Sequence, residues 1–164
     1  MNTKKIWVIR AGKKGDAHEL FMNQGYIVLQ AQKMGDLRKL AKNRKAFYGA
    51  YAANHPDDGS VSVSGIGGKF FRFEHEIRVG DLIVYACIFD KMIYIGKVKG
   101  EYFFDTASNN DFPHRRQVQW KGCFPKNILS ESARRELGAA RTLFAIKKNL
   151  PEILQTISKK AKKL

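Results

Sequence analysis

Residues 5–15 read KIWVIRAGKKG, a run of β-branched and aromatic residues that ends in a short, doubly basic turn between two glycines. Such a run predicts a β-strand that is apolar on both faces, as expected for a strand in the interior of a sheet. Successive side chains of a strand point to opposite faces, so Trp7 and Arg10 are predicted to lie on opposite sides. The two side chains would share a cavity only if the strand bends or ends between them.

The turn that follows this strand combines conformational freedom with positive charge. Gly12 and Gly15 permit a ligand to approach the backbone closely, and Arg10, Lys13 and Lys14 supply three cations. The turn is therefore predicted to form one wall of a nucleotide-binding cleft. The alternative from this stretch alone is a buried first strand followed by a solvated basic turn.

The chain of 164 residues carries 30 Lys and Arg against 15 Asp and Glu, a net charge of +15. Residues 1–50 carry +8, residues 51–100 are neutral, and residues 101–164 carry +7. This distribution predicts a basic surface on one side of the fold, for which a polyanion such as nucleic acid is the natural partner. The length is that of one domain, predicted over residues 1–148, with a C-terminal basic helix or tail over residues 149–164.

The cysteines and the apolar runs indicate the cellular compartment. Cys87 and Cys123 stand in apolar stretches without a CxxC motif, which predicts small buried hydrophobic residues in a reducing compartment. The apolar run in the first strand is too short for a signal peptide, and the longest run, Leu82–Phe89, has only the length of a strand. We therefore expect a cytoplasmic protein that does not contact a membrane.

The rest of the chain combines short strands with helices. Asp16 is predicted to cap a first short helix, which Gly25 ends, and Gly96 inside a strand predicts a bulge that curls the sheet. The expected strands cover residues 26–29, 82–89, 92–98, 101–105, 114–120 and 142–146, the expected helices cover 35–51, 66–77, 127–137 and 152–163, and a loop covers 54–68. This order predicts an α+β fold, a small, partly closed β-barrel with helices inserted between its strands.

Residues 114–120 alternate between polar and apolar positions, which predicts a strand with one face on the core. Arg116 shares the apolar face with Val118 and Trp120, so the arginine is predicted to sit at the rim of the core and to reach into a cleft. Basic and aromatic residues are also interleaved near Tyr102. Stacking surfaces beside phosphate contacts are what recognition of an unpaired or flipped base requires.

Metal and cofactor sites find little support in the sequence. The histidines have no HExxH spacing, the cysteines are unpaired, and neither a phosphate-binding loop nor a nucleophile elbow is present. We therefore expect no metal, no cofactor and no catalytic activity in this chain. A small nuclease is an alternative, because four carboxylates gather in the neutral middle of the chain: Glu74, Glu76, Asp81 and Asp90.

Several sequence motifs occur together, in the same order, in one known type of domain. They are WVIRAG (7–12), GDL (35–37), FEHEIRVGD (73–81), GKVKGEY (96–102) and HRRQVQW (114–120). The ordered set, over roughly residues 5–146, resembles the PUA-like, EVE-related N-terminal domain of Mrr-type, modification-dependent restriction enzymes. The resemblance implies a PUA/EVE/YTH-like pseudo-barrel that flips a modified base, typically a methylated cytosine, into an aromatic pocket. Relatives often carry a Gly-Trp pair after the second strand, where this chain has Gln30-Ala31.

The motifs and the charge pattern together define two sets of expected site residues. The residues expected to line a base pocket are Trp7, Arg10, Ala11, Gly12, Gln30, Tyr102, Arg116 and Trp120. The residues expected to hold phosphates are Lys13, Lys14, Arg38, Lys42, Lys45, His114 and Arg115.

The expected function is that of a module that recognises a modified or flipped base in DNA, in a restriction or phage-defence context. A nuclease domain or a partner protein is the expected companion, since the 164 residues hold no nuclease domain of their own. An RNA-binding module of the PUA or ASCH type has the same electrostatics and is the main alternative. A scaffold whose basic surface meets an acidic protein is a further alternative.

Overall fold

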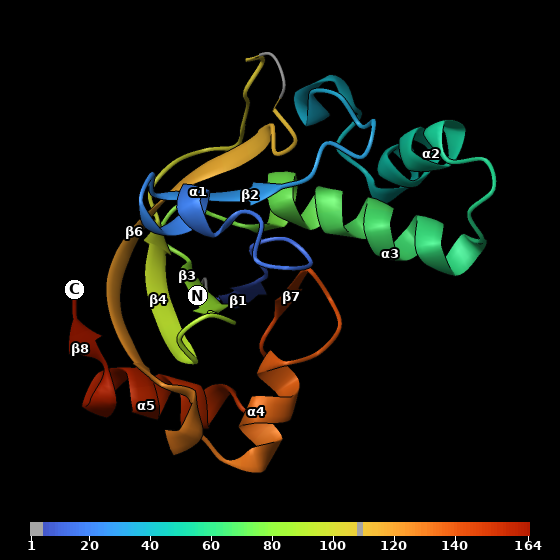
Figure 1. The fold of residues 1–164 in the computed structure, drawn as a ribbon. Helices are drawn as coiled ribbons and strands as arrows, with labels where there is room; N and C mark the ends of the chain where they lie inside the picture. Colours follow the sequence, from blue (N-terminus) through green and yellow to red (C-terminus); the bar gives the residue numbers. More distant parts are fainter. Residues whose placement is uncertain (1–4, 108–109) are drawn as a thin grey trace.

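Strand β1 (Ile6–Ile9) lies inside a curled, mixed sheet in the computed structural model, which describes residues 5–107 and 110–164 (Figure 1). All four of its side chains are buried. It pairs in parallel with β3 (Leu82–Ala86) on one side and antiparallel with β7 (Leu143–Ala145) on the other. The prediction of an interior first strand is confirmed, because a strand that is apolar on both faces needs cover on both faces.

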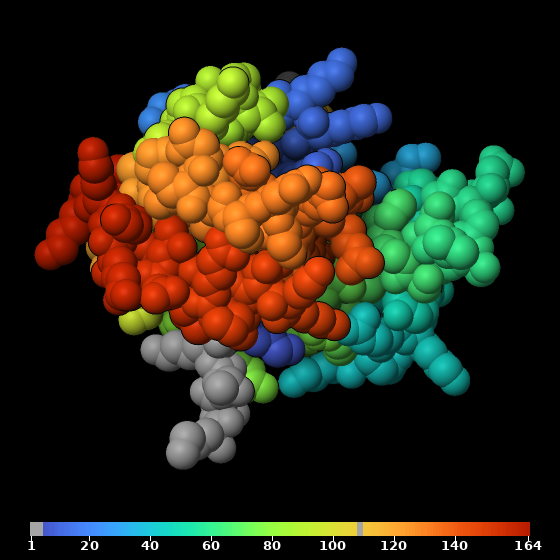
Figure 2. Space-filling view, turned by 90° about the horizontal axis from the view of Figure 1, so that it is seen from below, coloured from blue at the N-terminus to red at the C-terminus, as the bar shows by residue number. Residues whose placement is uncertain are grey.

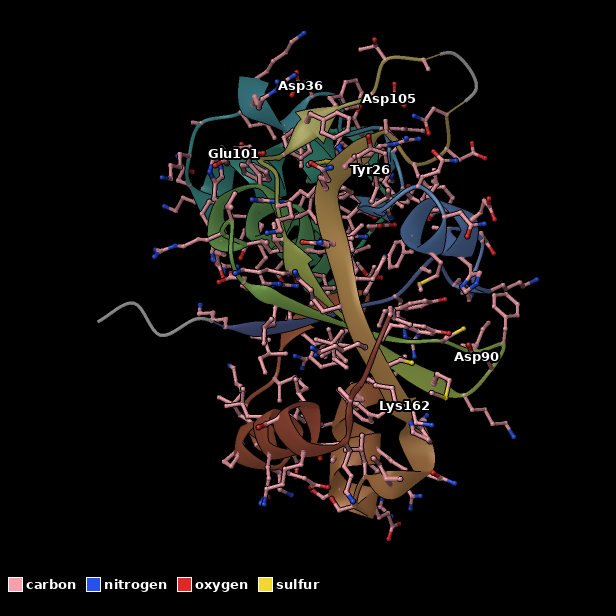
Figure 3. All side chains as sticks on the ribbon, turned by 90° about the vertical axis from the view of Figure 1, so that its left-hand side faces the viewer. Tyr26, Asp36, Asp90, Glu101, Asp105 and Lys162 are labelled. Carbon is pink, nitrogen blue, oxygen red and sulfur yellow. The ribbon has the colours of Figure 1, made fainter. Side chains whose placement is uncertain are left out.

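The long strand β6 connects the two halves of this sheet, whose order is β2–β6–β4–β3–β1–β7. In Figure 3, β6 runs along the molecule, with Tyr26 and Asp105 near one end and Lys162 beside the other. β5 and β8 also pair with β6, and every pairing of the described strands apart from β1–β3 is antiparallel. The bounds of these strands are β2 Tyr26–Leu29, β4 Met92–Val98, β5 Phe103–Phe104, β6 His114–Pro125 and β8 Lys162–Lys163.

A bulge curls the sheet into a half-barrel. The register between β4 and β6 shifts between Ile95 and Gly96. A Cβ atom on Gly96 would lie 2.7 Å from the side chain of Val118, so the two strands pack this closely only with glycine at this position. The predicted bulge is confirmed. The architecture is α+β with a curled half-barrel, compatible with the small, partly closed barrel that was expected.

Helices cover both faces of the sheet (Figure 1). Those on the first face are α1 (His18–Met22), the 3₁₀ turn η1 (Leu37–Lys39), α2 (Arg44–Asn54), α3 (Ser60–Phe71) and the π-helical turn η2 (Arg72–Glu76). Those on the second face are the 3₁₀ turn η3 (Lys126–Ile128), α4 (Glu131–Leu137) and α5 (Leu150–Lys160). The sheet thus separates two hydrophobic cores.

The alternation of β1 assigns its side chains to these two cores. Trp7 and Ile9 belong to the first core, and Ile6 and Val8 belong to the second. The buried indole of Trp7 donates a hydrogen bond from Nε1 to Oδ2 of Asp81 over 3.0 Å, which satisfies both polar groups. β1 therefore links the two cores through its two faces.

One prediction about the segment before β3 is wrong, because residues 54–68 were expected to form a loop but α3 begins at Ser60. The helix expected over 66–77 is confirmed, and its last turn, η2, is π-helical. Gly67 explains the difference, because a Cβ atom there would lie 2.9 Å from the ring of Tyr48 on α2. The small residues that predict a loop in isolation here let two helices pack closely, and this packing outweighs their low helix propensity.

Further differences concern helix ends and the C-terminus. The helix expected over 35–51 is divided into η1 and α2, and the side chain of Asn43 caps α2 by accepting the N–H of Ala46. Ala17, not Asp16, occupies the N-cap position of α1. The segment 149–164, expected as a basic helix or tail, packs on the second core through Ile153, and its last residues pair with β6 as β8.

A helix that crosses a bilayer needs about 20 predominantly apolar residues. Among the helices of residues 5–107 and 110–164, none combines that length with sufficient apolar character.

Candidate functional site

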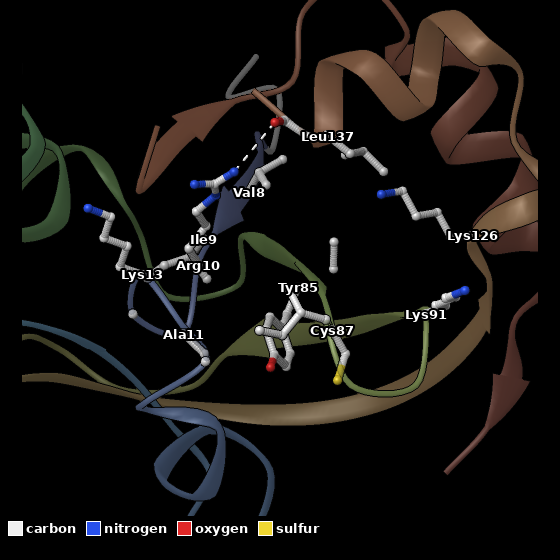
Figure 4. A pocket seen from close by; sticks show the side chains of 15 residues that line it. Val8, Ile9, Arg10, Ala11, Lys13, Tyr85, Cys87, Lys91, Lys126 and Leu137 are labelled. Carbon is white, nitrogen blue, oxygen red and sulfur yellow. Dashed lines mark hydrogen bonds between the residues drawn. The ribbon is translucent and has the colours of Figure 1, made fainter. Parts of the chain in front are cut away.

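A cavity of about 320 Å³ opens where β1 ends, and we call it the β1 cavity (Figure 4). Beyond Ile9 the backbone leaves the sheet and turns through Gly12 and Gly15, whose φ angles are 80° and 78°. Side chains strongly disfavour this left-handed region, so the turn depends on glycine at both positions. The N–H of His18 then donates to the carbonyl of Gly15 over 3.0 Å, and α1 begins.

Three segments that are far apart in the sequence form the walls of the β1 cavity. The first is the turn over residues 10–15, the second is the end of β3 and the hairpin that follows it, and the third runs from η3 to the end of α4. Figure 2 shows the turn in blue next to the yellow-green hairpin tip and the orange η3–α4 segment on one face of the molecule. Buried apolar residues at the end of β1, Val8 and Ile9, line its inner part.

Four of the residues that line the β1 cavity are basic, and none of the described lining residues is acidic. Arg10 spans the cavity edge, and its Nη2 donates to the carbonyl of Gly138 over 3.4 Å. Lys126 extends toward the cavity from the opposite side, with Lys13 and Lys91 at the edges (Figure 4). An apolar floor with a cationic rim fits a ligand that has a flat apolar part and a phosphate.

Tyr85, which also lines the cavity, carries a hydroxyl group. The hydroxyl lies 2.8 Å from Nδ1 of His18. Burial raises the pKa of Tyr85, and the neighbouring Cys87 raises it further, so the hydroxyl stays protonated and shares a hydrogen bond with His18. This bond links the ring of Tyr85 to α1.

The tip of the β3–β4 hairpin exposes two apolar side chains beside the β1 cavity. Ile88 and Phe89 are 62% and 63% exposed. The ring of Phe89 nevertheless has a fixed surrounding, because it meets the ring of His18 edge-on at 5.1 Å and covers Gly15, where a Cβ atom would lie 2.7 Å away. An exposed aromatic ring is therefore held in place next to a cationic cavity.

Asp90 fixes the turn of this hairpin. Its Oδ1 accepts the N–H of Met92 over 2.9 Å, and its Oδ2 accepts the hydroxyl of Tyr94. Burial raises the pKa of Asp90, but these two hydrogen bonds, together with Cys87 and His18, lower it overall. Lys91 adopts a positive φ of 58° in the same turn. The hairpin tip thus has one defined shape.

The structure brings three of the eight predicted base-pocket residues to the β1 cavity: Arg10, Ala11 and Gly12. Trp7 faces the other side of β1 and lines a different cavity, because the strand stays regular up to Ile9. The expectation that Trp7 and Arg10 lie on opposite sides is confirmed. Gln30 is exposed just beyond β2, and Trp120 is half-buried, with its Nε1 donating to the carbonyl of Phe21.

Two more predicted base-pocket residues, Arg116 and Tyr102, are buried away from the β1 cavity. Arg116 is 1% exposed, and its guanidinium donates to the carbonyls of Phe73 and Gly100 over 3.0 and 3.2 Å. Burial lowers the pKa of Arg116. The alternation of β6 places this side chain on the apolar face, as predicted, but η2 and the segment before β5 cover it, so it lies in the core and not at the rim.

Tyr102 and His114 form a buried hydrogen-bond network. The hydroxyl of Tyr102 lies 2.9 Å from Nδ1 of His114 and accepts the N–H of Leu37, while Nε2 of His114 faces the carbonyl of Ala31 at 3.3 Å. Burial lowers the pKa of His114 to about 4, so the ring is neutral near pH 7, with its proton on Nε2. A neutral, fully buried imidazole does not provide the phosphate contact that was predicted.

The ionisation of Glu74, which lies near Arg116, makes the stability of the folded protein depend on pH. Burial raises the pKa of Glu74 to about 6, although Arg116 and Arg38 lower it, and its buried Oε2 has no hydrogen-bond partner among the described residues. A folded-state pKa above the ordinary value of 4.5 means that ionisation destabilises the folded protein; this penalty is absent below pH 4.5 and complete above pH 6.

Glu74→Gln is therefore expected to raise the thermal unfolding midpoint at pH 7, and this gain should disappear as the pH falls from 6 to 4.5. Circular dichroism melts between pH 4.5 and 7.5 measure the effect. The matched control is Glu131→Gln on α4, because that carboxylate is 69% exposed. A gain that is the same at every pH would contradict the assignment.

The predicted phosphate-binding residues divide into two groups. Lys13 lines the β1 cavity, and Lys14 is exposed beside it. The other group lies toward the far end of the molecule: Arg38 pairs with Asp36 over 2.8 Å, Arg115 pairs with Asp105 over 3.3 Å, and Lys42 and Lys45 are exposed near the start of α2. Asp36 and Asp105 lie well away from Asp90 at the hairpin tip (Figure 3).

The four carboxylates of the nuclease alternative serve separate roles. Asp81 accepts from Trp7 and from the N–H of Arg78, and Asp90 fixes the hairpin turn. Glu76 pairs with Arg44, and Glu74 lies near Arg116. In the described residues, no group of three or more His, Cys, Asp or Glu side chains is placed to hold a metal ion.

Sequence reasoning missed the parts of the site that come from outside the first turn. These are Tyr85, Ile88, Phe89, Lys91 and Lys126. One signal for the hairpin tip was available, since two large apolar residues directly before the Asp90-Lys91 turn are too close to the turn for both to be buried. Lys126 carries no such signal, because only the folded sheet brings η3 next to β1.

The fold and the cavity define an α+β protein with a cationic pocket at the end of an interior strand. The chain belongs to the family described as Domain of unknown function (DUF8426), whose model matches residues 7–146. A comparison with curated proteins finds no match. All residues that line the β1 cavity fall within the matched range, whereas α5 and β8 lie beyond it.

Proposed function

We propose that this protein is a DNA-binding reader that takes one flipped, modified base into the β1 cavity. The observation that carries the proposal is the composition of the cavity, an apolar floor with four basic and no acidic residues among the described lining positions. A neutral ligand would not need the cations, and a small inorganic anion would not need the apolar floor. A nucleotide uses both, with its base on the floor and its phosphates on Arg10, Lys13, Lys91 and Lys126.

The exposed hairpin tip supports the same proposal. A base that leaves the duplex leaves a gap in the stack, and proteins that distort DNA often insert apolar side chains between base steps. Phe89 is exposed, is fixed against His18 and Gly15, and lies beside the cavity that would receive the base. In this proposal the ring of Phe89 occupies the gap while the base occupies the cavity.

The resemblance to PUA-like, EVE-related domains of Mrr-type enzymes agrees with this ligand class, and it favours DNA over RNA. In that context a nuclease domain or a partner protein supplies cleavage, and this chain supplies recognition. The basic residues at both ends of the sequence provide the attraction to a polyanion that such a module needs.

The proposal is tested by fluorescence anisotropy with duplexes of one sequence that carry cytosine, methylated cytosine or other modified bases. We expect tighter binding to one modified duplex, and Phe89→Ala should weaken that binding by about tenfold, as base stacking contributes roughly 1–3 kcal/mol. Val61→Ala on α3 is the matched control, because Val61 is an exposed apolar residue that does not line the cavity. Equal affinity for all duplexes overturns the base-reading proposal, and a clear preference for structured RNA in competition overturns the choice of DNA.

A further inference from the structure

A second cavity, of about 460 Å³, lies on the other side of β1, and we call it the Trp7 cavity after the strand residue that lines it. Its remaining walls come from α2, η2 and the segment from α4 to just beyond β7. Five basic and two acidic residues line it. The basic ones are Lys5, Arg44, Arg72, Arg141 and Lys147.

Both acidic residues of the Trp7 cavity already have partners. Glu76 forms an ion pair with Arg44. The carboxylate of Glu136 accepts the backbone N–H groups of Lys147, Lys148 and Asn149 over 2.8–3.0 Å. Among the described residues, Lys5, Arg72, Arg141 and Lys147 therefore have no carboxylate partner.

Arg72 is the most constrained of these cations. Its Nη2 donates to the carbonyl of Leu143 over 3.1 Å, but its Nε is buried and has no acceptor among the described residues. Burial lowers the pKa of Arg72, and repulsion from Arg44 and Arg141 lowers it further, while attraction to Glu76 offsets part of the decrease. An anion in this cavity would offset the repulsion between the three guanidinium groups.

We propose that the Trp7 cavity is a phosphate-binding site, with Arg72 and Arg141 as its principal contacts. Arginine is suited to this ligand, because its planar guanidinium offers parallel N–H donors to two phosphate oxygens. The site goes beyond the proposed function, since it lies across β1 from the base cavity and requires no flipped base. Its phosphate comes from one of two sources, the backbone of a bound nucleic acid or a free phosphate compound.

The first test titrates the full chain with inorganic phosphate and follows NMR signals from residues inside and outside the Trp7 cavity. We expect saturable shifts of the signals of the Arg72 Nε–H and the Trp7 indole N–H. The signal of the Trp120 indole N–H, which donates a hydrogen bond to the carbonyl of Phe21, should not shift. Arg141→Gln should weaken this binding by about tenfold. Arg141 is exposed, so the variant is expected to fold.

Arg135→Gln is the matched control, because Arg135 is an exposed arginine on α4 outside the Trp7 cavity. Unmoved Arg72 and Trp7 signals, or the same affinity in Arg141→Gln, overturn the proposal. Because the titration contains no nucleic acid, its outcome is independent of the base-reading proposal. Arg10→Gln in the β1 cavity is expected to leave these shifts unchanged.

A second measurement identifies the source of the phosphate. If the phosphate belongs to a nucleic-acid backbone, Arg141→Gln should reduce the slope of log K against log salt for duplex DNA by about 1. If the phosphate belongs to a free compound, the slope stays unchanged while the titration with inorganic phosphate still saturates.

Discussion

Replacing Arg10 and Lys126 together with glutamine is expected to weaken the binding of duplex DNA by on the order of 100-fold at low salt. The two cations approach the β1 cavity from opposite sides, and neither has a carboxylate partner among the described residues (Figure 4). A hydrogen bond to a charged group contributes about 1.5–3 kcal/mol, and 1.4 kcal/mol corresponds to a factor of ten, so each lost phosphate contact accounts for about tenfold. The loss is measured by anisotropy titrations between about 50 and 200 mM salt, because the affinity that phosphate contacts provide falls steeply over this range.

The same titrations also give the number of phosphate contacts. Each phosphate contact contributes a slope of about −0.9 to log K against log salt, so the double variant should have a slope smaller in magnitude by about 2. The control removes the same charge elsewhere, by Lys159→Gln with Lys160→Gln at the exposed end of α5. If both double variants lose affinity equally, the protein binds DNA through its overall charge, and the β1 cavity has no special part in binding.

The fold could be predicted where local chemistry determines the structure. The alternation of β1 correctly separated Trp7 from Arg10, and Gly96 correctly predicted the bulge, because a close backbone approach leaves room only for glycine. The helix α3 could not be predicted in this way. Its glycines and serines lower helix propensity, and only contact with Tyr48 of α2 makes the small residues favourable.

The candidate site, likewise, could be predicted only where its residues are close together in the sequence. The turn from Arg10 to Lys13 lies within one stretch of sequence, so its charge and its glycines could be recognised together. Lys91 and Lys126 reach the same cavity only because β3 pairs with β1 and β4 pairs with β6, and no local pattern encodes those pairings. Burial depth is equally non-local: alternation placed Arg116 on the correct face, but its cover comes from residues 73 and 100.

Arg116→Met is expected to lower the free energy of unfolding by about 3 kcal/mol, a cost typical of breaking a buried charged contact. Methionine is similar in length to the stem of arginine, but it leaves the carbonyls of Phe73 and Gly100 without their donor and Glu74 without its nearby cation. The unfolding midpoint of a domain of this size should fall by roughly 6–12 °C. Differential scanning calorimetry measures the shift, and Arg135→Met, at a site with 79% side-chain exposure, provides the control.

The decisive comparison for Arg116 is between stability and binding. Because the guanidinium is buried away from the β1 cavity, the folded Arg116→Met variant should bind a modified duplex as the original protein does at a temperature well below its unfolding midpoint. Arg10→Gln should show the opposite pattern, with its stability nearly unchanged and its binding weakened, because Arg10 is exposed at the cavity edge. If Arg116→Met instead stays stable and loses binding, the base pocket lies around Tyr102 and Arg116, and the β1 cavity does not receive the base. The two variants together therefore distinguish a structural arginine from a recognition arginine.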